Sequence, residues 1–213
     1  MDKKNSYTTI AHDVRIKTTF KKSRFYASVK EVEKDKQVKE FLKELKQEFP
    51  DANHHCWAYH VGIDGNQIKQ HSDAGEPANS AGVPISQAIE QEKITNVMVI
   101  VTRYFGGIKL GIGGLIRAYR ETALKGLRQA GRLEKYALRE FFLRGINYGE
   151  LGGILQAIKS RGGLINHIDY DQKISIVSSL SDDEQEWLNN MIKNISRGRA
   201  TIKIGQIKWY KKK

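Results

Sequence analysis

The 213-residue sequence is notable first for what it has little of, which is cysteine and long apolar runs. A single cysteine, Cys56, excludes an intramolecular disulfide. The longest apolar run, Val97 to Val101, falls far short of the ~20 residues that a membrane-spanning helix needs. The first five residues are polar and lack the apolar stretch of a signal peptide. We therefore expect a soluble, cytoplasmic protein that has no membrane partner.

Acidic residues are also fewer than basic residues. The chain carries 36 basic and 24 acidic residues, a net charge of +12. Basic residues exceed acidic ones by 23 to 16 in residues 1–135 and by 13 to 8 in residues 136–213. A basic surface favours polyanions such as RNA, DNA or phosphorylated ligands. Because acidic residues are interspersed throughout, a lysine-rich soluble surface without a polyanion partner explains the charge equally well.

Hydrophobic periodicity predicts an α+β fold in two domains, residues 1–135 and 136–213. Residues 1–22 are mixed and basic, and no element is assigned to them. A hairpin turn is expected at Asp64-Gly65-Asn66. In the first domain, strands are predicted at 23–32, 56–63, 67–71 and 96–104, and helices at 38–49, 84–92 and 114–129. In the second, the order is strand 138–146, helix 149–161, strands 164–170 and 173–179, helix 182–195 and strand 200–209. This β-α-β-β-α-β order is the ferredoxin-like arrangement.

A glycine-rich segment follows the continuous apolar strand at 96–104 and leads into a helix. It holds five glycines within nine residues, namely Gly106, Gly107, Gly111, Gly113 and Gly114. Glycine permits close backbone approach to a ligand, and a helix N-terminus is a ready anion site. Neither the phosphate-loop pattern nor the dinucleotide-binding pattern matches, because Leu110 follows Lys109 and Ile116 stands where a glycine is required. ATPase and Rossmann functions are therefore not favoured.

Basic residues gather on one side of the predicted helix. A helical wheel places Ile116 with the apolar residues and Arg117 and Arg120 on the opposite, polar face. Together with Lys109, these cations lie near a helix N-terminus, where positive charge opposes the helix dipole unless an anion binds there. We expect an anion site. The alternative is a solvated basic face that Glu121 partly balances.

The loop at 72–84 contains two acids, Asp73 and Glu76. They can serve as a general acid–base pair or as Mg²⁺ ligands. The favoured alternative is a structural loop that forms ion pairs with Arg103 or Lys109 and caps the following helix.

A third candidate site is the histidine- and cysteine-containing stretch at 53–60, which overlaps the strand predicted at 56–63. His54, Cys56 and His60 share one face of the strand and suggest zinc, or a cysteine nucleophile with a histidine base. No second cluster of ligands appears elsewhere in the sequence, and a cysteine in a strand is more often a buried apolar residue. We therefore expect Cys56 to be buried and free, with no metal.

Together these motifs resemble the IMPACT family, in its bacterial branch of the YigZ type. The resemblance covers nearly the whole chain. It is carried by Lys22-Ser23-Arg24-Phe25, by His55-Cys56-x-Ala58-Tyr59, by Ser72-Asp73-x-Gly75-Glu76-Pro77, by Ala81-Gly82-x-Pro84 and, with the highest specificity, by the long segment from Arg103 to Tyr119.

The resemblance implies an N-terminal domain like the second domain of a small-subunit ribosomal protein. It also implies a ferredoxin-like C-terminal domain similar to those of elongation factor G. Both comparisons point by fold analogy to RNA or ribosome contact and to a translation-related regulator, with no firmly implied enzymatic reaction and no cofactor. We expect phosphate contacts from the side chains of Arg103, Lys109, Arg117 and Arg120 and from the backbone of the five glycines.

Aromatic residues of the same segment are candidates for stacking on bases. These are Tyr104, Phe105 and Tyr119, of which Phe105 and Tyr119 are expected in the core. Two other functions stay open. One is a small-molecule phosphate enzyme that uses Asp73 and Glu76, and the other is a protein-interaction module that acts through the ferredoxin-like sheet.

Overall fold

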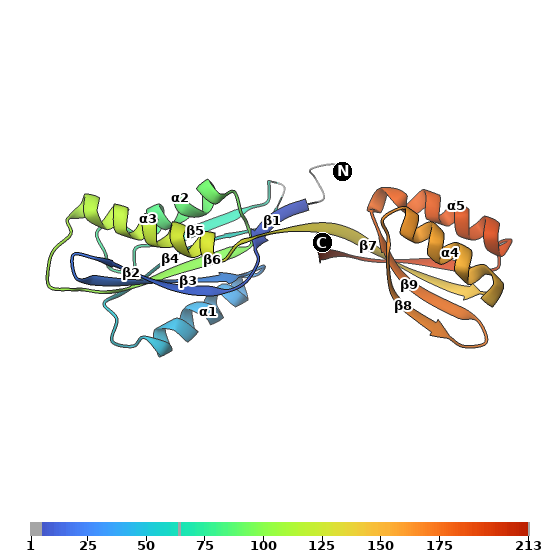
Figure 1. The fold of residues 1–213 in the computed structure, drawn as a ribbon, viewed down its shortest axis with the longest axis horizontal. Coiled ribbons are helices and arrows are strands. Elements are labelled where there is room, and N and C mark those ends of the chain that lie inside the picture. The colour runs from blue at the N-terminus through green and yellow to red at the C-terminus, as the bar shows by residue number, and fades with distance from the viewer. Residues whose placement is uncertain (1–5, 64, 213) are drawn as a thin grey trace. The chain divides into compact units, whose positions relative to one another are not determined.

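The computed structural model describes residues 6–63 and 65–212. The chain divides into two compact units, Met1–Glu134 and Lys135–Lys213, each of which combines helices with an antiparallel sheet (Figure 1). This is the predicted α+β class. Independent folding of residues 136–213 stays a prediction, because compactness alone does not test it.

The first unit is a five-stranded antiparallel sheet with helices on both faces (Figure 1). Its strand order is β2-β3-β6-β4-β5, and a further strand, β1, precedes it in the chain. The elements are β1 (Ser6–Ile10), β2 (Val14–Phe20), β3 (Ser23–Glu31), α1 (Asp35–Glu48), β4 (His54–Val61), β5 (Ile68–Ser72), α2 (Gly82–Glu92), β6 (Val97–Tyr104) and α3 (Ile112–Gln129).

The central strand of this sheet is β6, and its first seven residues are all buried. Its alternate side chains enter two different cores. Val99 and Val101 pack with α2 and α3, whereas Met98 and Ile100 pack with α1. A continuous apolar run is what a strand covered on both faces requires, so the prediction of a fully buried strand is confirmed.

The sequence-based assignment missed β1 and β2. In β2 the half-buried Val14 and Ile16 alternate with the exposed Arg15 and Lys17, a period-two pattern that the basic composition of this segment obscured. The predicted turn at 64–66 includes residue 64, which lies outside the described residues. The strands on either side of it, β4 and β5, do pair antiparallel.

The second unit has the predicted β-α-β-β-α-β element order. Its elements are all but the first three residues of β7 (Arg132–Ile146), and α4 (Tyr148–Ser160), β8 (Leu164–Tyr170), β9 (Ile174–Leu180), a 3₁₀ turn (Asp182–Glu184), α5 (Gln185–Ser196) and β10 (Thr201–Lys211). The strands pair antiparallel in the order β10-β7-β9-β8. Helices α4 and α5 lie on one face of this sheet (Figure 1).

Candidate functional site

The glycine-rich segment forms the turn between β6 and α3. A side chain at Gly106 would place its Cβ 2.1 Å from the carbonyl carbon of Lys22, so only glycine allows the turn to lie against the β2–β3 hairpin. The Gly106 N–H donates to Ser23 Oγ at 3.1 Å. At this position, therefore, the close approach that glycine permits is to the protein's own backbone.

Helix α3 begins without a side-chain cap. Its N-cap residue is Gly111, which has a φ of +73° that favours glycine. The first intrahelical bond runs from the Leu115 N–H to the Gly111 carbonyl at 2.9 Å. The N–H groups of residues 112–114 precede that bond, as the first N–H groups of an α-helix do, and they point out of the helix N-terminus. This end of α3 is therefore a suitable place for negative charge.

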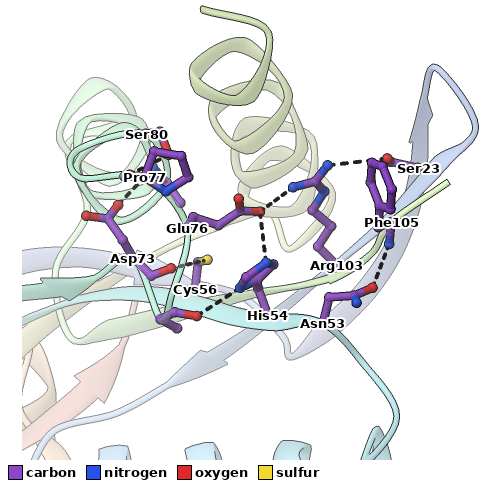
Figure 2. Close-up of polar contacts among 12 residues, drawn as sticks. Ser23, Asn53, His54, Cys56, Asp73, Glu76, Pro77, Ser80, Arg103 and Phe105 are labelled. Carbon is purple, nitrogen blue, oxygen red and sulfur yellow. Dashed lines mark hydrogen bonds and ion pairs between the residues drawn. The ribbon is translucent and has the colours of Figure 1, made fainter. Parts of the chain in front are cut away.

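Glu76 lies at the centre of the polar contacts beside this turn (Figure 2). Its carboxylate accepts hydrogen bonds from Arg103 Nη1 at 2.6 Å and from the Tyr119 hydroxyl at 2.7 Å. Nε2 of His54 is 3.9 Å from the same oxygen. The Glu76 and Arg103 side chains are only 4% and 7% exposed, so the two charges compensate each other inside the protein.

Asp73 supports the start of α2. Its carboxylate accepts hydrogen bonds from the backbone N–H groups of Asn79, Ala81 and Gly82 at 2.8–2.9 Å. Burial raises the pKa of Asp73, but the three N–H groups stabilise the carboxylate and leave the pKa below its usual value. The contacts of Asp73 and Glu76 are those of the structural alternative, in which one acid pairs with Arg103 and the other caps the helix.

Cys56 is fully buried and free, as predicted. Its sulfur lies 2.9 Å from the Asp73 carbonyl oxygen and 3.3 Å from the Tyr119 hydroxyl. Burial raises the pKa of the Cys56 thiol to about 12, so the thiol is protonated at neutral pH and a poor nucleophile. Within residues 6–63 and 65–212, no three His, Cys, Asp or Glu side chains are placed to share a metal ion.

A pocket of about 430 Å³ opens beside the glycine-rich turn. Its lining comes from the ends of β4 and β6, from the acidic loop, from the glycine-rich turn and from the start of α3. The lining residues are Asn53, His54, Glu76, Pro77, Arg103, Phe105, Lys109, Leu110, Gly111, Ile112 and Leu115.

The structure distributes the four predicted phosphate-binding side chains over different environments. Arg103 and Lys109 line the pocket, although Arg103 is buried and Lys109 is exposed. Arg117 and Arg120 are exposed on α3 and do not line it. Arg120 Nη2 instead donates to Gln91 Oε1 on α2 at 2.9 Å. Two of the four predicted cations therefore line the pocket, and two do not.

The apolar residues of this segment also depart in part from expectation. Tyr119 is fully buried, as predicted, whereas Phe105 is 46% exposed rather than in the core. Ile116, which the helical wheel grouped with the apolar face, is 38% exposed. It follows Leu115 by about 100° around the helix, far enough to leave the buried face.

Sequence reasoning did not place Asn53 and His54 beside the glycine-rich turn, and it considered His54 only as a metal ligand or a catalytic base. Asn53 Oδ1 accepts the Phe105 N–H at 2.8 Å, and His54 Nδ1 lies 3.0 Å from the Ala74 carbonyl oxygen (Figure 2). Both residues lie far from the glycine-rich turn in sequence. The pairing of β4 with β6 brings them beside it, since His54 is opposite Arg103.

These features define a class of protein: a two-unit α+β protein with a cation-containing pocket beside a glycine-rich turn. Comparison with known proteins then identifies the family. The model of the Impact N-terminal domain matches residues 21–127. The chain belongs to the IMPACT family.

Its similarity to bacterial members extends over nearly the full length. The chain is 30% identical over 208 residues to IMPACT family member YvyE of Bacillus subtilis, covering 98% of this chain and 95% of that protein. It is 32% identical over 198 residues to IMPACT family member YigZ of Escherichia coli, covering 92% and 97%. A crystal structure of a protein described as hypothetical superposes with a TM-score of 0.67 at 31% identity, covering 96% of this chain and 98% of the other.

None of the helices among the described residues is both long enough and apolar enough to span a membrane.

Proposed function

We propose that this protein binds single-stranded RNA through its first unit and acts in the cytoplasm in contact with RNA or the translation machinery. The single observation that carries the proposal is a convergence of exposed cations at one end of the sheet. The β2–β3 hairpin supplies Lys21, Lys22 and Arg24, and the glycine-rich turn supplies Lys109. The backbone contact between Lys22 and Gly106 holds the hairpin against the turn. We call these four residues the basic end.

The N-terminus of α3 adds to the positive potential of the basic end. Cations close to a helix N-terminus raise the energy of the free protein, and a bound phosphate removes that cost. Binding of a polyanion is therefore the simplest way in which this charge arrangement becomes favourable.

Aromatic side chains lie next to the basic end on the sheet. The Arg24 guanidinium carbon is 4.8 Å from the ring centroid of Tyr104, and the Tyr104 and Tyr26 rings are 6.1 Å apart in an edge-to-face arrangement. Both tyrosines are half-buried. Cations interleaved with partly exposed rings suit a single strand, whose phosphates bind the cations and whose bases stack on the rings.

The strand order of the second unit supports the fold comparison that the family resemblance implies for it. The strand order β10-β7-β9-β8 with two helices on one face is what a ferredoxin-like domain has. We propose this comparison for the second unit, and the likeness to the second domain of a small-subunit ribosomal protein for the first. Both fold comparisons bear on the function of this protein only by analogy.

The contacts of the two loop acids do not favour the enzymatic alternative. The Asp73 carboxylate is held by three backbone N–H groups, and Glu76 is held by Arg103 and Tyr119. A general acid or base must instead be able to exchange a proton with a substrate.

The proposal is tested by fluorescence anisotropy with a labelled single-stranded RNA at several salt concentrations. The triple variant Lys21→Gln, Lys22→Gln, Lys109→Gln should lose RNA affinity about tenfold or more. Each lost phosphate contact lowers the slope of log K against log salt by about 0.7, so the slope should become shallower by roughly two. The matched control is Lys43→Gln, Lys125→Gln, Lys203→Gln, which removes the same charge from exposed sites elsewhere. Equal losses in both variants, or no RNA binding by the parent protein, would contradict the proposal.

A further inference from the structure

The pocket beside the glycine-rich turn has a polar end and an apolar wall. Its volume of about 430 Å³ lies within the range of ~300–1,000 Å³ that is typical of small-molecule sites. A site of this kind accommodates a ligand that has a charged group at one end and a flat apolar group at the other.

The polar end is the start of α3. Gly111 and Ile112 line the pocket there, at the point where the first N–H groups of the helix have no intrahelical acceptor. Lys109, two residues earlier, lines the same pocket and is exposed. Backbone donors and one exposed ammonium group together suit a phosphate, which accepts several hydrogen bonds at once.

Arg103 provides a second and independent indication of a ligand. This residue is 6% exposed and lines the pocket. Nη1 of Arg103 donates to Glu76, but among the described residues no acceptor lies within reach of Nε. A buried donor without an acceptor costs free energy, and a shift of the Arg103 side chain toward a ligand oxygen in the pocket would remove that cost.

The apolar wall consists of Phe105, Leu110 and Leu115. Phe105 is 46% exposed although it is a large apolar residue, and its backbone N–H is fixed by Asn53. The guanidinium carbon of Arg103 lies 5.6 Å from the centre of the Phe105 ring. An exposed ring held in place at the mouth of a pocket is suited to stack against a flat heterocycle.

We propose that this pocket binds a nucleotide, with its phosphate at the N-terminus of α3 beside Lys109 and its base against Phe105. This inference rests on the proposed RNA-binding function in one respect, since the nucleotide is either a free nucleoside monophosphate or the 5′-terminal residue of an RNA strand. Both sources present the same chemistry to the pocket, a phosphate monoester joined through a ribose to a base.

The first test is isothermal titration of the full chain with uridine and adenosine 5′-monophosphate and with inorganic phosphate. Both nucleotides should bind saturably and more tightly than inorganic phosphate, because the base adds its contact with Phe105. Lys109→Gln and Phe105→Ala should each weaken nucleotide binding about fivefold or more. No saturable nucleotide binding, or inorganic phosphate binding as tightly as the nucleotides, would overturn the inference.

Matched controls separate the site from general charge and folding effects. Lys125→Gln removes an exposed lysine further along α3, and Ile108→Ala shortens an exposed apolar residue of the same turn that does not line the pocket. Both should leave nucleotide affinity within twofold, with unchanged melting curves for all four variants. Equal losses in Lys109→Gln and Lys125→Gln would mean that the charge acts diffusely, and the site would be refuted.

A second titration distinguishes the two sources of nucleotide. Short RNAs carrying either a 5′-phosphate or a 5′-hydroxyl are compared. If the parent protein binds the 5′-phosphate RNA more tightly, and Lys109→Gln abolishes this difference in affinity, the ligand is an RNA end. If free nucleotides bind but the two RNAs bind equally well, the ligand is the free monophosphate. RNA binding that Lys21→Gln, Lys22→Gln weakens, without any saturable nucleotide binding, would refute only the pocket. Nucleotide binding without RNA binding would refute only the proposed function.

Discussion

The sheet of the first unit is covered on both faces, whereas that of the second unit has helices on one face. Strand β6 of the first unit is buried over seven consecutive residues. In β9 of the second unit, buried Ile174 and Ile176 alternate with half-buried Ser175 and Val177. A sheet covered on both faces reads as a continuous apolar run, whereas a sheet with one open face alternates buried and less buried residues.

One ion pair of each unit illustrates this difference. The Arg103–Glu76 pair of the first unit is 7% and 4% exposed, whereas the Arg139–Asp182 pair of the second unit is 23% and 47% exposed. Desolvated charges depend on each other, whereas exposed charges are solvated with or without a partner. The candidate site therefore lies in the unit whose architecture can hold a buried charge.

The largest effect on stability should come from placing a carboxylate in a strand of each sheet. Val99→Asp places a carboxylate in the core between β6, α2 and α3, and the first unit should fail to fold. Val177→Asp, on the half-buried face of β9, should cost only about 1 kcal/mol. Circular dichroism melting, with hydrogen exchange to assign each transition, measures both. A second unit that unfolds together with the first in Val99→Asp would show that residues 136–213 do not fold independently.

A smaller effect should come from removing one member of each ion pair. Glu76→Ala leaves Arg103 buried without its partner and should lower the free energy of unfolding by about 3–5 kcal/mol. Asp182→Ala removes an exposed partner from the half-buried Arg139, which water still reaches, and should cost about 0–1 kcal/mol. Urea denaturation of both variants makes the comparison. Similar losses in the two variants would contradict the contrast between the units.

Acid should weaken the first unit through His60. This residue is 1% exposed and its Nε2 lies 2.9 Å from Ser86 Oγ. Burial, assisted by the charge of Lys69, lowers the pKa of His60 to about 4 from 6.5. The unfolded chain therefore binds this proton more readily than the folded protein does, and stability is lost as the pH falls from 6.5 toward 4, by up to about 1.4 kcal/mol per pH unit.

The His60 prediction is checked by urea denaturation of the first unit at several pH values. His60→Gln should flatten the pH dependence in this window, whereas His167→Gln, at an exposed position of β8, should not change it. A parent protein whose stability is constant from pH 6.5 to 4 would exclude the burial effect.

The smallest effect should come from arginines on the surfaces of the two units. Arg117→Ala with Arg120→Ala removes exposed side chains of α3 and one hydrogen bond to Gln91, and stability should change by less than about 1 kcal/mol. Arg161→Ala, which breaks an exposed pair with Glu184, should behave similarly. Thermal melts of the variants compare the two surfaces. A loss of several kcal/mol from α3 alone would show that these arginines have a structural role that the contacts described here do not explain.

Local patterns in the sequence determined much of the fold. The apolar run of β6, the alternation of β3 and the three- and four-residue spacing of α1 each predicted the correct element, because each depends on which faces of one segment are buried. The specific motif from Arg103 to Tyr119 indicated the family. Strand β2 was missed because its alternation is carried partly by threonine and basic residues, which are weak signals of burial.

The candidate site was decided by tertiary structure. The sequence placed Asp73 and Glu76 three residues apart, but only the folded chain directs one to the backbone of α2 and the other to Arg103. It likewise took strand pairing to bring His54 to Arg103 and to expose Phe105 at the pocket. Periodicity reports the burial of a segment against an unspecified neighbour, whereas a site depends on which neighbours meet and in what register, which long-range packing alone establishes.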